Sequence, residues 1–246
     1  IVRADTLRDP KFVDNLGKLR TFDVVIANPP FSLKQWGHEN WATDPHRRSE
    51  YGGVPPKNQG DYAWVQHMLA SASPDGGRVG VVMPHGVLFR SGAEAKIRQH
   101  LIESDLLEAV IGLPANLFYG AGIPACLLIF RKEKAAGDKG KVRIVDGSKR
   151  FVAGRAQNSL SDQDVAALFE AYTDAEVEIE NVKQAVVDVS EIEANDWDLN
   201  IGRYIEQDAA EIIDTAEALK ALRQAEQNTA EAQAAMDQRL KAAGYA

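Results

Sequence analysis

The chain has 246 residues, 45% of them hydrophobic, and a formal net charge of −8 at pH 7. This length can bury a full core in one or two domains. No run of about 18 apolar residues and no charged-then-apolar leader occurs, so we expect a cytoplasmic protein without membrane contact. The single cysteine, Cys126, lies in an apolar run, and the five histidines are not at ligand spacings. A buried thiol and no metal site are therefore expected.

Two apolar runs near the beginning of the chain, residues 1–7 and 22–27, predict short strands. Asp5 stands near the carboxyl end of the first run, and doubly wound sheets bind their ligands at that end of a strand. Residues 32–60 combine Gly, Pro, Asn and charged residues without periodicity. They predict a long loop, and a loop of this length in a compact domain is usually functional.

Strand and helix patterns alternate through the middle of the chain. The expected helices are residues 61–73, 91–102 and 162–172, and the expected strands are residues 78–83 and 106–113. Two further strands, residues 123–131 and 142–146, flank a polar turn and predict a hairpin at the sheet edge. Alternating strands and helices predict an α/β domain of three layers.

The last part of the chain has the composition of one long helix. Residues 206–243 contain no Gly or Pro and are rich in Ala, Glu, Gln and Lys. Ile205, Ile212, Leu219 and Leu240 fall on a seven-residue frame. Because so thin an apolar stripe cannot stabilise a lone helix, we expect this helix to bind a partner. A solvated tail helix is the alternative.

The most informative feature is Asn28-Pro29-Pro30-Phe31, directly after the strand predicted at residues 22–27. Each proline fixes φ near about −65° and removes a donor, so the carbonyls of Asn28 and Pro29 remain free to accept hydrogen bonds. The Asn28 amide and the free carbonyls can accept hydrogen bonds from an exocyclic amine, and the Phe31 ring can stack on a planar ligand. The motif therefore predicts a binding site for a planar ring that carries an exocyclic amine. The alternative is a strand closed by an ordinary proline turn.

The segment from Asp23 to Phe31 resembles the catalytic motif of the amino-methylating DNA methyltransferases. In the order and spacing of five segments, nearly the whole chain resembles the modification subunit of type I restriction-modification systems. These subunits are N6-adenine DNA methyltransferases that use S-adenosylmethionine. The five segments are residues 4–7, 22–31, 76–89, 113–126 and 198–204.

The resemblance implies how a flipped target adenine is held. Asn28 and the Pro29 carbonyl accept from the target amine, Pro30 keeps the backbone rigid, and Phe31 stacks on the base. Phe118 and Tyr119 match the position of a second aromatic on the other face of that base. Both could instead be packing aromatics.

The cofactor residues that the resemblance implies are Asp5, Thr6 and Asn28. Asp5 matches the residue that accepts from the adenine amine of S-adenosylmethionine, although a carboxylate at this place also suits a capped loop. The glycine-rich cofactor loop of the family, which precedes the Asp5 strand, is not in this chain. Neither Gly52-Gly53 nor Gly76-Gly77 follows a strand and opens a helix, so they are not substitutes.

The net charge of −8 argues against a self-sufficient nucleic-acid binder. However, the acidic excess lies after residue 160, and basic residues gather in the loop next to the motif. Lys34, Arg47, Arg48 and Lys57 are the expected contacts to the DNA backbone. The resemblance implies double-stranded DNA, a specificity subunit and a second modification subunit as partners, and it leaves open whether a restriction subunit joins them.

The resemblance also divides the chain. Residues 1–160 are expected to form a partial catalytic domain with a Rossmann-like sheet that is incomplete on its N-terminal side. Residues 161–204 extend this domain, and residues 205–246 form a subunit-binding helical tail. Two alternatives keep other functions open: methyl transfer to an RNA base or a glutamine side chain, and a non-catalytic scaffold that binds partner subunits.

Overall fold

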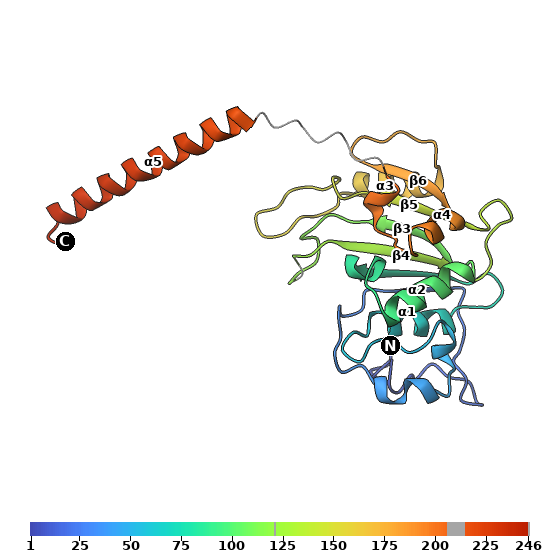
Figure 1. Cartoon of the computed structure of the whole chain (residues 1–246). Helices are drawn as coiled ribbons and strands as arrows, with labels where there is room; N and C mark the ends of the chain where they lie inside the picture. Colours follow the sequence, from blue (N-terminus) through green and yellow to red (C-terminus); the bar gives the residue numbers. More distant parts are fainter. Residues whose placement is uncertain (121, 206–214, 246) are drawn as a thin grey trace. The chain divides into compact units, whose positions relative to one another are not determined.

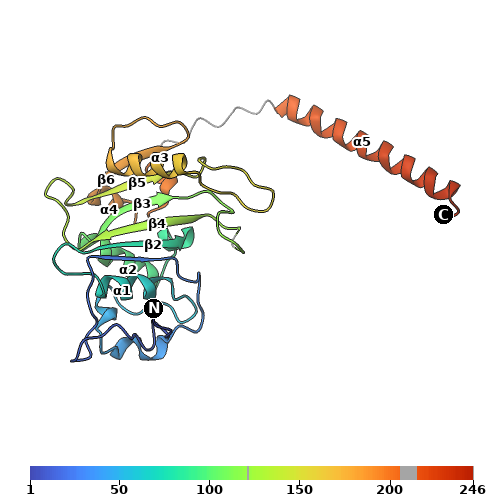
Figure 2. The same cartoon turned by 180° about the vertical axis from the view of Figure 1, so that it is seen from behind.

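The computed structural model describes residues 1–120, 122–205 and 215–245. Contacts divide the chain into two compact units, Ile1–Ile205 and Glu206–Ala246. The first unit contains a six-stranded sheet in the order β1-β2-β4-β3-β5-β6, an order that Figure 2 shows from β2 to β6. The strands are β1 (Val24–Ala27), β2 (Arg78–Pro84), β3 (Leu107–Gly112), β4 (Ala125–Arg131), β5 (Lys141–Asp146) and β6 (Lys183–Asp188).

Four α-helices and four short 3-10 helices connect these strands in the described part of the first unit. The α-helices are α1 (Asp61–Ala70), α2 (Ala93–Glu103), α3 (Asp162–Thr173) and α4 (Val189–Ala194). The 3-10 helices are η1 (His38–Thr43), η2 (Arg48–Glu50), η3 (His85–Leu88) and η4 (Ile201–Arg203). Helix α3 lies near β5 and β6, and residues 1–60 lie at the other end of the sheet (Figure 1).

The directions of the strands determine at which edge of the sheet each strand ends. β1 pairs in parallel with β2, and β3 pairs in parallel with β5. β4 runs antiparallel to both β2 and β3, and β6 runs antiparallel to β5. Strands β1, β2, β3 and β5 therefore all end at the same edge of the sheet. We call it the carboxyl edge; Asn28, His85 and the loop after Leu113 all follow strands that end there.

The two faces of the sheet bury different residues, as the period of two along a strand requires. Val110 and Ile144 belong to the core that includes α1, α2 and α4. Their neighbours Ile111 and Val145 belong to a second core against α3. Helices thus cover both faces of a mixed sheet, and the predicted three-layer α/β fold is confirmed.

Two predictions about strands are wrong. Residues 1–7 form no strand, since the chain bends at Ala4 and turns at residues 6–8. Residues 123–131 and 142–146 form no hairpin, because β3 lies between β4 and β5. Leu128 and Phe130 are buried on one face of β4, and Leu127 and Ile129 are partly buried on the other. A strand that is apolar on both faces belongs in the middle of a sheet, which explains its place between β2 and β3. Cys126 is buried in the same strand, as expected.

The second unit contains α5 (Thr215–Ala242). The predicted helix began at residue 206, and residues 206–214, with Ile212, lie outside the described residues. Along α5 the large apolar side chains Leu219, Leu222, Met236 and Leu240 are exposed. Ile205 is 6% exposed and packs in the core of the first unit. The prediction that it belongs to the apolar stripe of the tail helix is therefore wrong. No helix in the described parts of the chain is long and apolar enough to span a membrane.

Candidate active site

Asn28 follows β1 directly at the carboxyl edge and is exposed. Pro29 behind it is buried, which anchors the backbone of the motif to the protein. Within the described residues, neither the Asn28 amide nor the Pro29 carbonyl has a hydrogen-bond partner. Two consecutive residues of the motif therefore each keep an acceptor without a partner in the described part of the chain.

Phe31 and Phe118 come together although 87 positions separate them in the sequence. Their ring centroids lie 6.3 Å apart with an interplanar angle of 79°, an edge-to-face arrangement. Both rings are partly buried, whereas Tyr119 is 97% exposed and has no ring contact among the described residues. Of the two aromatics predicted in this loop, Phe118 is the one that the fold places next to the motif.

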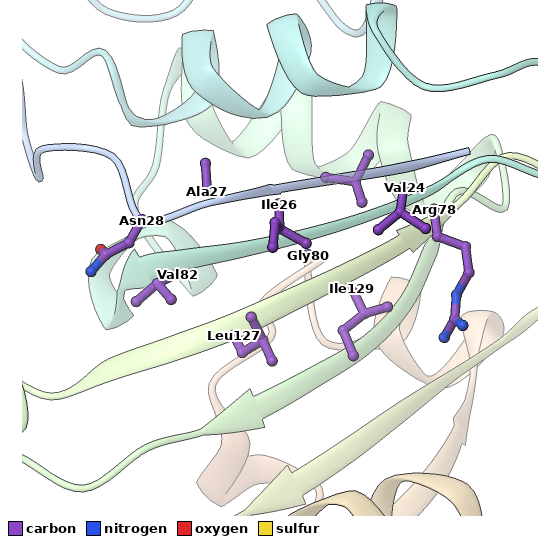
Figure 3. Close-up of a pocket in the computed structure, with 10 residues that line it drawn as sticks. Val24, Ile26, Ala27, Asn28, Arg78, Gly80, Val82, Leu127 and Ile129 are labelled. Atoms are coloured by element: carbon purple, nitrogen blue, oxygen red, sulfur yellow. The ribbon is translucent and has the colours of Figure 1, made fainter. Parts of the chain in front are cut away.

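An apolar hollow of about 580 Å³ runs along the sheet face from Asn28. Asn28 and Arg78 place polar groups at opposite ends of this hollow, and aliphatic side chains line the face between them (Figure 3). Val24 and Ile26 in this lining are 62% and 78% exposed. Apolar walls with a few polar groups are typical of small-molecule sites. The remaining side chains of the lining include Val82, Leu127 and Ile129.

A second cavity, of about 510 Å³, lies on the other side of β1, between residues 2–12 and α1. Thr6 and Ala27 both line it, so one predicted cofactor residue faces the end of β1. The volume is within the range of about 300–1,000 Å³ that small-molecule sites have. Apolar side chains make up most of its lining, and Thr6, Ser71, Lys11 and His67 add polar groups.

Asp5 caps a turn in this structure. Its Oδ1 accepts from the backbone N–H groups of Leu7 and Arg8 at 3.2 and 3.0 Å, and its Oδ2 accepts from the Arg8 guanidinium at 3.1 Å. Burial acts to raise the pKa of Asp5, but the hydrogen bonds and charge of Arg8 outweigh it and lower that pKa. The capped-loop alternative therefore describes Asp5 here, and its cofactor contact stays a prediction.

Three of the four predicted DNA-contacting cations are on the surface. Lys34 and Lys57 are exposed, and so is Arg47, which pairs with Glu50 at 2.6 Å. The loop that carries them is ordered around a small core of its own, in which Trp36 and Trp41 are each 1% exposed. A loop with such a core holds its cations in defined positions.

Arg48 is the exception, and its prediction as a DNA contact is wrong. Its side chain is 3% exposed and pairs with Asp44 through two oxygens at 2.8 Å. Its guanidinium also donates to the Leu7 carbonyl at 2.9 Å and lies 4.1 Å from the centroid of the Trp41 ring. With these partners Arg48 ties the loop to the N-terminal segment and cannot reach a phosphate.

We expect Arg48→Ala to lower the free energy of unfolding by about 3–5 kcal/mol, because the buried carboxylate of Asp44 would lose its charge partner. Urea unfolding followed by circular dichroism measures this change. The neighbouring Arg47→Ala is the matched control, and at an exposed position its effect should stay within about 0.5 kcal/mol. Equal effects of the two substitutions would show that the buried pair contributes little.

The Asp44 pair also predicts a pH dependence. Burial acts to raise the pKa of Asp44, but hydrogen bonds and charge from Arg48 outweigh it and lower that pKa. A lowered folded-state pKa contributes stability above the unfolded value of 3.8. This contribution is lost as the pH falls through the folded pKa. Arg48→Ala should therefore reduce the difference in stability between neutral and strongly acidic solution.

Sequence reasoning missed two features of the carboxyl edge. His85, which follows β2, has a buried Nε2 without a hydrogen-bond partner in the described part of the chain, and burial lowers the pKa of its ring. Asp61 is the first residue of the helix predicted at residues 61–73, and its carboxylate binds Ser32 and Arg90. The acidic residue at the start of a helix was the one available signal. Among the described residues, no three His, Cys, Asp or Glu side chains group as metal ligands would.

The model of the family described as N-6 DNA Methylase matches residues 1–212. The type I restriction enzyme MjaVII methylase subunit of Methanocaldococcus jannaschii is 36% identical over 82% of this chain and 35% of its own length. The type I restriction enzyme HindI methylase subunit of Haemophilus influenzae is 29% identical over 98% of this chain and 55% of its own length.

A solved structure agrees with these matches. The type I restriction-modification system methyltransferase subunit from Streptococcus thermophilus has a TM-score of 0.74 and 35% identity, and the match covers 83% of this chain and 42% of that one. The chain spans between about a third and a little over half of the length of these relatives. With a family model that matches 212 of its 246 residues, the chain belongs to the N-6 DNA Methylase family.

Proposed function

We propose that this chain is the target-base part of an enzyme that transfers a methyl group from S-adenosylmethionine to the N6 amine of adenine in DNA. The observation that carries the proposal is the pair of free acceptors at Asn28 and Pro29, set beside the Phe31 ring at a strand end. Membership of the N-6 DNA Methylase family supports the same reaction.

The residues of the motif account for the chemistry at the base. The target adenine must leave the duplex, at a cost of a few kcal/mol. The Asn28 amide oxygen and the Pro29 carbonyl then accept the two amine hydrogens, which draws the nitrogen toward tetrahedral geometry and exposes its lone pair. Bound S-adenosylmethionine supplies the electrophilic methyl group. After attack the amine nitrogen loses one proton, so no strong general base is required from the protein.

The aromatic residues hold the base in place. In this proposal Phe31 stacks on one face of the flipped adenine, and Phe118, already in edge-to-face contact with Phe31, limits its movement. Base–aromatic stacking tolerates a base that is no longer paired, because every base has a π-face. Tyr119 is fully exposed and could close over the base only by moving.

Residues for the cofactor and for the partners complete the proposal. Thr6, and Asp5 once it leaves Arg8, would hold the nucleoside end of S-adenosylmethionine beside β1. Lys34, Arg47 and Lys57 would contact the DNA backbone. The relatives are named as methylase subunits of type I restriction enzymes. We therefore propose that a specificity subunit selects the DNA sequence and that a second modification subunit, and a restriction subunit, join the complex.

Phe31→Ala should weaken binding of DNA with an extrahelical adenine by about 1–3 kcal/mol, the scale of one base–aromatic stack. A fluorescence titration of the assembled enzyme with 2-aminopurine at the target position measures this loss. Phe169→Ala on α3 is the matched control, because that ring is 63% exposed and contacts Tyr172, which binds Glu108 near the beginning of β3. Equal affinities of the Phe31 variant and the parent would refute the stacking role.

A further inference from the structure

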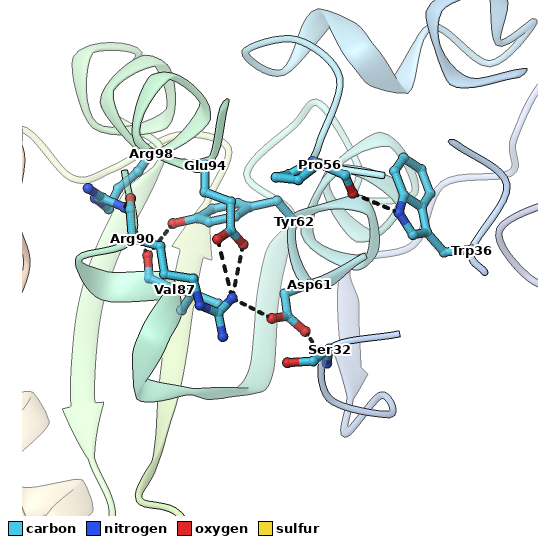
Figure 4. Close-up of polar contacts among 9 residues, drawn as sticks. All are labelled: Ser32, Trp36, Pro56, Asp61, Tyr62, Val87, Arg90, Glu94 and Arg98. Atoms are coloured by element: carbon cyan, nitrogen blue, oxygen red, sulfur yellow. Dashed lines mark hydrogen bonds and ion pairs between the residues drawn. The ribbon is translucent and has the colours of Figure 1, made fainter. Parts of the chain in front are cut away.

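The chain turns sharply at Ser32, directly after Phe31. Ser32 has a φ of 53°, in the left-handed region that residues other than glycine rarely adopt. Its backbone N–H donates to Asp61 Oδ1 at 2.7 Å. Asp61 is the first residue of α1 and is 1% exposed. A buried carboxylate from another element therefore holds the turn of the motif in place (Figure 4).

The same carboxylate belongs to an ionic group in which two carboxylates are buried and the arginine between them is partly exposed. Arg90 Nη1 donates to Asp61 Oδ2 at 2.8 Å and to both carboxylate oxygens of Glu94 at 3.2 Å. Glu94 lies on α2 and is 1% exposed. Gly86 leaves room for this arrangement, since a Cβ there would lie 2.5 Å from Arg90 Nε. The Arg90 guanidinium thus connects three parts of the chain: α1, α2 and the segment that follows η3.

A second arginine balances the charge. Arg98 is 3% exposed and donates to the carbonyls of Val87 and Arg90 at 3.1 and 3.0 Å. Burial raises the pKa of Glu94, and the charges of Arg90 and Arg98 oppose that rise. Arg90 thus binds both buried carboxylates, and Arg98, whose guanidinium binds backbone carbonyls, adds a second positive charge near Glu94. Such groups are often no more stabilising than apolar residues of the same volume, so cohesion alone does not explain their presence here.

We propose that Asp61, Arg90 and Glu94 form a buried clamp that positions the Phe31 ring for the target base by fixing the turn at Ser32. The inference rests on the proposed methyl transfer. Asp61 and Glu94 are too deeply buried to touch the base, and the clamp therefore acts through Phe31. Asp61 carries the largest share, since it binds both Ser32 and Arg90.

A double-mutant cycle tests this coupling. Asp61→Asn keeps the volume of the side chain but places an amide where a carboxylate faced Arg90. In the complete enzyme with its partner subunits, Asp61→Asn should lower kcat by about tenfold to a hundredfold and leave the KM for S-adenosylmethionine nearly unchanged. In a Phe31→Ala background the same substitution should change kcat by less than about threefold, because the ring on which it acts is absent. Equal losses in both backgrounds, or no loss in either, would overturn the proposal.

Glu108→Gln is the matched control for loss of a partly buried ion pair. Glu108 pairs with Arg131 at 2.9 Å and accepts from Tyr172 at 2.7 Å, near the beginning of β3 and away from the carboxyl edge. This variant should lose stability in urea and retain the kcat of the parent. An equal loss of kcat in Glu108→Gln would mean that general destabilisation explains the effect of Asp61→Asn.

A spectroscopic measurement separates the clamp from the proposed function. In protein labelled with 4-fluorophenylalanine, the ¹⁹F line of Phe31 is assigned by its loss in Phe31→Ala. Asp61→Asn should shift or broaden this line, and Glu108→Gln should leave it unchanged. An unaltered Phe31 line in Asp61→Asn would refute the clamp whatever the activity. A shifted line in an enzyme that does not methylate adenine would refute the proposed function alone.

Discussion

Asn28→Ala should abolish adenine methylation in the assembled enzyme, with a loss of about 10²-fold or more in rate. The substitution removes one of the two acceptors that we propose for the reacting amine, and loss of one preorganised group of this kind typically has an effect of this size. Asn28 is exposed and has no hydrogen-bond partner within the described residues. The fold should therefore remain intact, and the loss should appear in kcat.

Mass spectrometry of N6-methyladenine in digested DNA measures the rate, and circular dichroism verifies the fold. Asn195→Ala is a suitable control, because Asn195 ends α4 and bonds only locally, to the Glu191 carbonyl at 2.9 Å. Near-parental turnover of a folded Asn28→Ala enzyme would rule out the mechanism.

Deletion of residues 206–246 should leave the α/β unit folded and remove association with a specificity subunit. Contacts separate the two units after Ile205, and Ile205 itself stays in the core of the first unit. Strong helix formers without an apolar core of their own gain stability mainly by packing against another surface. Sequence-specific methylation should disappear together with the association.

Co-purification of the truncated chain with a specificity subunit tests this expectation. A yield equal to that of the full chain would support the alternative that α5 is a solvated helix without a partner. A finer version uses the full chain. Replacing the exposed Leu219, Met236 and Leu240 with Ser should weaken association. Replacing the polar Gln224, Gln227 and Gln233 of the same helix with Ala is the matched control.

Much of the fold was predictable because local patterns and tertiary structure agree. Val79, Val81 and Met83 are buried in β2, as an apolar strand within a layered sheet requires. The helices α1 and α3 begin at the predicted residues, 61 and 162. The proline pair after β1 marks a strand end whatever its surroundings, so the position of Asn28 at the carboxyl edge followed from sequence alone.

Two of the wrong predictions, the hairpin and the DNA contact of Arg48, concern partners that are distant in sequence. The pattern of β4 and β5 could not show that β3 separates them, because hairpins and inserted strands share the same local alternation. Arg48 is a charged residue in a polar loop, which is typical of a surface position. It is buried because its guanidinium contacts the Trp41 ring and the Leu7 carbonyl, and only the folded structure shows these contacts. The bond between Asp61 and Ser32 spans 29 positions and has no local signature.

In the reaction that we propose, the Asn28 motif directs a methyl group to the N6 amine of adenine in DNA. The most direct test gives the assembled enzyme S-adenosylmethionine with a tritiated methyl group, in the presence of duplex DNA, RNA and protein substrates. Digestion and chromatography then locate the label. We predict tritium in N6-methyladenine from DNA, absent with Asn28→Ala; label in cytosine, in RNA or on a glutamine side chain, or no transfer at all, would contradict the account.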